Sequence, residues 1–120
     1  MPRLLTGILT MMQLCAVSDI PEQEGLAVMT RQGEVVLLQR DGQIYAYRNL
    51  CPHLGIDLNF QPDVFMDLDG MFIQCANHGA LFQVEDGLCI HGPCQGQSLQ
   101  PVPVVVRDGT VWMATTDAAP

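Results

Sequence analysis

The chain has 120 residues and a mass of 13.2 kDa, the size of one ordinary domain, and its hydrophobic share of 48% excludes a wholly disordered chain. Thirteen acidic residues against five basic ones, all arginine, give a net charge of -8. Binding to nucleic acid or to an anionic membrane needs a cationic surface, so both kinds of partner are disfavoured.

The stretch Leu4–Ser18 is mostly apolar but is interrupted by Thr6, Gly7, Thr10 and Gln13. A membrane span needs about 20 mostly apolar residues, so this stretch is too short and too polar. Arg3 ahead of it leaves a weak secretory signal open as an alternative. We expect a flexible leader over residues 1–12 and a first strand at Gln13–Val17.

Tight turns divide the rest of the chain into short apolar segments. Asp-Gly between such segments predicts a hairpin, because both residues tolerate positive φ. The pairs are Asp41-Gly42, Asp69-Gly70, Asp86-Gly87 and Asp108-Gly109, with Gln32-Gly33 as a further turn candidate. The expected hairpins join Glu34–Gln39 to Gln43–Arg48, Leu81–Glu85 to Leu88–Ile90, and Val102–Arg107 to Thr110–Ala114.

Sustained helical periodicity is lacking, and a single helical turn within Ser18–Glu24 is the most that the pattern supports. Short strands joined by tight turns favour an all-β fold, an antiparallel β-sandwich or small barrel. We expect one domain over residues 13–116 and a tail over 117–120.

Two segments break the strand pattern with residues that bind metals: Cys51-Pro52-His53-Leu54-Gly55 and Cys75-Ala76-Asn77-His78-Gly79. Each offers one thiol and one imidazole directly after an expected strand, Ala46–Leu50 or Met71–Gln74. Loops on rigid strands hold ligands in place. Four such residues in two matched motifs indicate one shared metal centre.

This pair of motifs resembles the Rieske family of [2Fe-2S] proteins, in which two histidines replace two cysteines on one iron. The similarity extends to Leu14–Pro21, Asp41–His53, His78–Phe82 and the Gly92-Pro93 loop. It implies a two-loop cluster-binding subdomain and one [2Fe-2S] cluster per chain. Cys51 and Cys75 would bind one iron, and His53 and His78 the other.

The sequence departs from the family pattern in ways that bear on the reduction potential. The spacer from His53 to Cys75 is longer than usual, which we interpret as an extended hairpin or loop around Asn59–Leu68. Ile56 and Asn77 stand where high-potential members carry bridging cysteines, and Ala80 and Phe82 where they carry hydroxyl donors. Fewer donors to sulfur predict a low potential of about -150 mV.

The resemblance implies an electron carrier, not an enzyme, because only His91 remains for a second metal site. We expect a ferredoxin between a flavin reductase and a terminal oxygenase. The alternative is a small Rieske subunit of a reductase complex, of the nitrite reductase type. No cation occurs from Asn49 to Val106, whereas six acids do, so the redox partners should present a basic docking face; the acids are Asp57, Asp63, Asp67, Asp69, Glu85 and Asp86.

Other chemistry-bearing residues leave further interpretations open. A zinc-stabilised interaction module is the alternative of another class, although mixed thiol and imidazole pairs are unusual for zinc fingers. Cys89, His91 and Cys94 could form a redox disulfide or a second metal site. The odd number of cysteines favours a cytoplasmic location. Cys15, Phe72 and Trp112 are expected in the core.

Overall fold

The computed structural model describes residues 9–22, 24–52, 58, 65–76 and 79–116. Within them, nine strands form three antiparallel sheets of three strands, in the orders β1-β9-β8, β2-β3-β4 and β5-β6-β7. The strands are β1 (Leu9–Ala16), β2 (Leu26–Thr30), β3 (Gly33–Arg40), β4 (Gln43–Arg48), β5 (Ile73–Gln74), β6 (Leu81–Phe82), β7 (Cys89–His91), β8 (Val104–Arg107) and β9 (Thr110–Thr116). The predicted all-β antiparallel class is confirmed.

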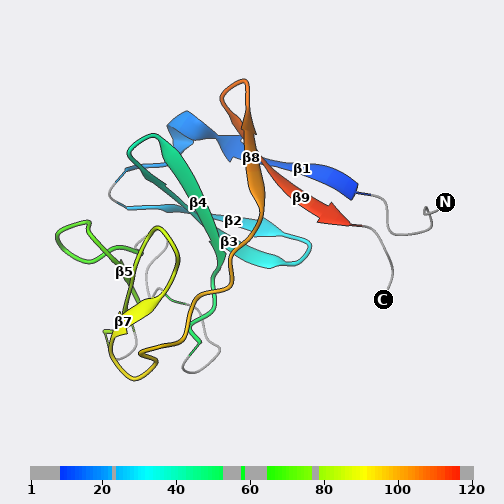
Figure 1. Ribbon diagram of the computed structural model, residues 1–120. Coiled ribbons are helices and arrows are strands. Elements are labelled where there is room, and N and C mark those ends of the chain that lie inside the picture. Colours follow the sequence, from blue (N-terminus) through cyan, green and yellow to red (C-terminus); the bar gives the residue numbers. More distant parts are fainter. Residues whose placement is uncertain (1–8, 23, 53–57, 59–64, 77–78, 117–120) are drawn as a thin grey trace.

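The sheet β2-β3-β4 lies between the other two, with β1 and β9 at one end of the molecule and β5 and β7 at the other (Figure 1). Alternate side chains of β3 therefore serve two cores. Val35 and Leu37 pack in a cluster with residues of β9, whereas Val36 and Leu38 pack in a cluster with residues of β5, β6 and β7. Burial on both faces explains why β3 is a continuous apolar run instead of an alternating one.

Two of the expected hairpins close with two-residue turns. Arg40 pairs with Gln43 across Asp41-Gly42, and Arg107 with Thr110 across Asp108-Gly109. Asp41 and Asp108 have φ angles of 53° and 51°, and the φ angle of the glycine that follows each of them is also positive. These are the backbone conformations that the tight turns require.

Strand boundaries differ from the prediction near the start of the chain. The first strand begins at Leu9, four residues before Gln13, and β2 was not expected from the sequence. The helical turn is a 3₁₀ helix over Val17–Asp19, with the Asp19 Oδ2 accepting a hydrogen bond from the Ala16 amide at 3.2 Å. No helix in the described part of the chain is long and apolar enough to cross a membrane.

Phe72 and Trp112 were expected in the core, but both side chains are only half-buried. Trp112 lies on β9, and its neighbours Val111 and Met113 on that strand are buried. Cys15 is also half-buried and packs against the β9-side core. Alternation along a strand buries one face only, and the Trp112 side chain lies between the two buried positions of β9.

Candidate metal centre

Cys51 follows β4 and is 2% exposed. Asn49, two residues earlier, is buried and anchors this end of β4 on the neighbouring strand. Its amide donates to the Glu34 carbonyl at 2.9 Å, and its Nδ2 donates to the Glu34 Oε1 at 2.6 Å. The backbone that leads into Cys51 is therefore held on β3.

Cys75 follows β5 and is completely buried. Its amide donates to the Ala80 carbonyl at 2.8 Å, which closes the ends of the second predicted ligand loop. On the other side, the Gln74 amide donates to the Phe65 carbonyl at 2.8 Å. The thiol thus lies where a short hairpin is fixed by backbone hydrogen bonds on both sides.

A chain of hydrogen bonds connects the two cysteine-bearing segments through Leu58. The Leu58 amide donates to the Asn49 Oδ1 at 2.7 Å, and the Leu58 carbonyl accepts from the Ala76 amide at 2.7 Å. Cys51 and Cys75 belong to the same buried cluster as the Leu58 side chain. The fold therefore places in one buried cluster two cysteines that are 24 positions apart in the sequence.

The predicted ligands His53 and His78 lie outside the described residues, as do Ile56 and Asn77. Among the residues that are described, no group of three or more His, Cys, Asp or Glu side chains is placed to hold a metal ion. Cys89 and Cys94 therefore do not complete an all-cysteine site with Cys51 and Cys75. Two buried thiols on linked loops fit one half of a mixed thiolate and imidazole set.

A loop that follows β7 packs over the second ligand loop. A side chain at Gly92, whose φ is +106°, would place its Cβ 2.8 Å from the Ala80 Cα. Below this loop the Cys94 Sγ donates to the Cys89 Sγ at 3.0 Å. Burial, and then the hydrogen bond to Cys89, raise the pKa of the Cys94 thiol to about 12. The Cys94 sulfur is therefore a neutral thiol at physiological pH.

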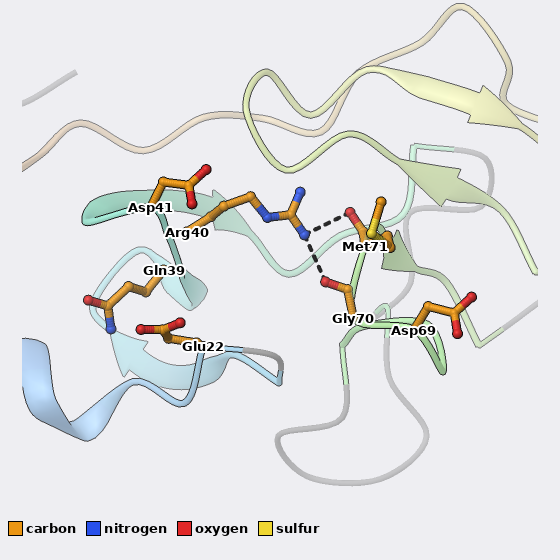
Figure 2. A pocket seen from close by; sticks show the side chains of 7 residues that line it. All are labelled: Glu22, Gln39, Arg40, Asp41, Asp69, Gly70 and Met71. Carbon is orange, nitrogen blue, oxygen red and sulfur yellow. Dashed lines mark hydrogen bonds between the residues drawn. The ribbon is translucent and has the colours of Figure 1, made fainter.

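Arg40 fixes the turn that precedes β5, a contact that the sequence did not suggest. Its guanidinium Nη2 donates to the carbonyls of Gly70 and Met71, each at 2.8 Å (Figure 2). The Nη1 contacts the Glu85 carboxylate at 3.4 Å. Figure 2 shows the pocket between the end of the β3–β4 hairpin and this turn, which Arg40 bridges. The turn lies in the long spacer that the sequence marks as unusual.

Comparison with known proteins agrees with this geometry. Residues 10–111 match the model of the Rieske [2Fe-2S] domain. The chain is 31% identical, over 85% of its length and 79% of the relative's, to the ferredoxin component of the alkene monooxygenase system of Xanthobacter autotrophicus.

Two solved structures are similar in fold and sequence. The ferredoxin of Sphingomonas yanoikuyae B1 has a TM-score of 0.72 at 28% identity, covering 88% of this chain and 99% of that one. A chain in a complex of reduced oxygenase and oxidized ferredoxin in carbazole 1,9a-dioxygenase has a TM-score of 0.70 at 28% identity, covering 87% and 92%. The chain belongs to the Rieske [2Fe-2S] domain family, whose members carry one such cluster per domain.

Proposed function

We propose that this chain is the ferredoxin component of an oxygenase system, accepting one electron from a flavin-dependent reductase and delivering it to a terminal oxygenase. The observation that carries the proposal is that Cys51 and Cys75 are both buried in one cluster, on two loops that hydrogen bonds connect through Leu58. Similarity to ferredoxin components over most of both chains supports the role of carrier over that of a catalytic subunit.

In this proposal Cys51 and Cys75 hold one iron, and His53 and His78 hold the other. When bound, the [2Fe-2S] cluster would supply a one-electron redox couple. The residues of this chain position the loops: Asn49 and Leu58 fix the first loop to the second. Supporting hydrogen bonds of this kind hold the ligand-bearing loops in a fixed geometry.

The partners are expected to present basic surfaces. In the described part of the segment from Asn49 to Val106, acids occur without any cation. Asp69, Glu85 and Asp86 are exposed on this part of the chain. Charge complementarity of this kind steers association and weakens with salt. None of the five cysteines, all of which the structure describes, forms a disulfide, which agrees with a cytoplasmic location.

The first experiment compares the purified protein with Cys51→Ser and Cys15→Ser variants. We expect a red-brown protein with one [2Fe-2S] cluster per chain, a Cys51→Ser variant that lacks the normal cluster, and a Cys15→Ser variant that keeps it. Reduced protein should then pass one electron per chain to a Rieske-type oxygenase. A colourless protein containing zinc, or a Cys51→Ser variant with the normal spectrum and iron content, would contradict the assignment.

The reduction potential of the cluster tests whether hydroxyl donors are lacking near the ligands. Ala80 and Phe82 are completely buried and provide no hydroxyl, so we expect a midpoint of about -150 mV. Ala80→Ser adds a donor worth about 1 kcal/mol, which is about 40 mV for one electron, and should raise the midpoint by that amount. Ala76→Ser, at an exposed position of the same loop, is the control and should leave it unchanged. A wild-type midpoint above zero would refute this reasoning.

A further inference from the structure

Cys89 and Cys94 form a pair of thiols that the proposed metal centre does not use. Their Sγ atoms lie 3.0 Å apart, and the two residues are 1% and 2% exposed. The Cys89 Sγ also lies 3.2 Å from the His91 carbonyl, to which it can donate. This distance between the two Sγ atoms is shorter than an ordinary van der Waals contact between sulfurs. The loop therefore holds the two thiols against each other.

Backbone hydrogen bonds define the loop that brings the thiols together. The Gln97 amide donates to the Cys94 carbonyl and the Cys89 amide donates to the Gln97 carbonyl, both at 2.8 Å. The Gly96 amide donates to the Cys89 carbonyl at 3.2 Å. A disulfide requires an S–S separation of about 2.0 Å, so the sulfurs need to approach by about 1 Å. Because the two thiols already contact each other, this movement is small.

We propose that Cys89 and Cys94 are a redox-active dithiol that a peroxide converts into an intramolecular disulfide. Both S–H bonds and the O–O bond of the peroxide break, and one S–S bond forms. The two sulfurs lose two electrons in total. Hydrogen peroxide gains those electrons and the two protons and leaves as two molecules of water. The dithiol is the resting form, and a cellular dithiol of the thioredoxin class reverses the reaction by thiol exchange.

Access for the oxidant requires only a local opening. Cys94 is buried, but Pro93 and Gln95 on either side of it are exposed, and the Gln95 amide is bound to the Gly92 carbonyl at a long 3.3 Å. Loop segments with exposed residues and long backbone hydrogen bonds open more readily than the sheets that carry them. A small peroxide can therefore reach the pair while the three sheets stay intact.

The disulfide would hold the loop against the second ligand loop, because Gly92 packs on Ala80. For a closed loop of about six residues, chain entropy lowers the population of open loop by a factor of about 40. Oxidation should therefore slow the loss of the cluster to a chelator by at least several fold. This consequence rests on the proposed function, whereas formation of the disulfide does not.

The test exposes the holoprotein to increasing hydrogen peroxide, followed by denaturation, alkylation of free thiols and mass spectrometry of peptides. We expect a Cys89–Cys94 disulfide, seen as a loss of two hydrogens, that forms before the half-buried Cys15 is oxidised. Dithiothreitol should restore both thiols. The visible spectrum, recorded before denaturation, reports separately whether the cluster is present.

Two variants complete the test. Cys94→Ser and Cys89→Ser should each abolish the disulfide and the protection of the cluster, and Cys15→Ser should change neither. The wild-type measurement stands alone if both variants fail to fold. Oxidation of Cys15 while Cys89 and Cys94 remain free, their conversion to sulfinic acids, or their pairing with other cysteines would overturn the proposal.

Discussion

Replacing Gly92 by alanine tests whether the loop after β7 is packed against the second ligand loop as the structure shows. The new Cβ would lie 2.8 Å from the Ala80 Cα and 3.0 Å from the Ala80 Cβ. The backbone φ of +106° also disfavours any residue with a side chain. Gly96, in the same loop, has a φ of +92° but no atom within 4 Å of its Cβ position, so it is a matched control.

The two effects can be separated by their magnitudes. Backbone strain at a positive φ costs about 1–2 kcal/mol and applies to both variants. Overpacking of a buried contact costs about 1–3 kcal/mol more and applies to Gly92→Ala only. Gly92→Ala should therefore lose about 2–5 kcal/mol of stability, a large part of the 5–15 kcal/mol of an ordinary domain.

Thermal unfolding at one fixed scan rate measures the difference, with circular dichroism reporting the strands and visible absorption reporting the cluster. At about 3–5 °C per kcal/mol, Gly92→Ala should melt about 3–15 °C below Gly96→Ala. Its cluster absorption should fall before the strand signal, because the clash lies beside the ligand loop. Rates of cluster loss at a fixed temperature give an independent comparison where unfolding is irreversible.

Equal melting of the two variants would refute the reasoning, since it would show that the contact with Ala80 imposes no constraint. If Gly92→Ala kept the stability of the wild type, the expected cost of a side chain at this positive φ angle would be contradicted as well. A selective loss of stability in Gly92→Ala is the result expected from the contact with Ala80, which Gly96 lacks.

Three other predictions follow from single side chains. Arg40→Ala should lower stability by about 1–2 kcal/mol in denaturant titrations, because two carbonyls of the turn before β5 lose a charged donor, whereas Glu85→Ala should have little effect because that ion pair is exposed. Asn49→Ala should cost about 1–3 kcal/mol and accelerate cluster loss, since the amide of Leu58 loses its acceptor; unchanged kinetics would show that this bond does not hold the loop. Burial, reinforced by nearby carboxylates, raises the pKa of Tyr47 to about 12 from an ordinary value near 10, so the unfolded chain releases this proton first and stability should fall as the pH rises from about 10 to 12. Tyr47→Phe should remove that part of the pH dependence, and an identical slope in both proteins would contradict it.

The class of the fold and the positions of two of its tight turns could be predicted from local features of the sequence. Asp41-Gly42 and Asp108-Gly109 are recognisable because a two-residue turn requires positive φ, a local requirement that few residues meet. The two Cys and His motifs are also local, and their spacing led to the correct family. Strand β2 was missed because it is an edge strand, with Met29 71% exposed, and its pairing with β3 defines it more than its own pattern does.

The tertiary structure alone decided which distant groups meet. Nothing in the spacing of Asn49, Leu58 and Ala76 indicates that their polar groups form one chain between the two cysteines. The same holds for Arg40 and the turn before β5, 30 positions away in the sequence. Sequence patterns report which face of a strand is apolar, but contacts between loops depend on how the sheets stack. That stacking is a property of the whole core, so these contacts could be seen only in the folded chain.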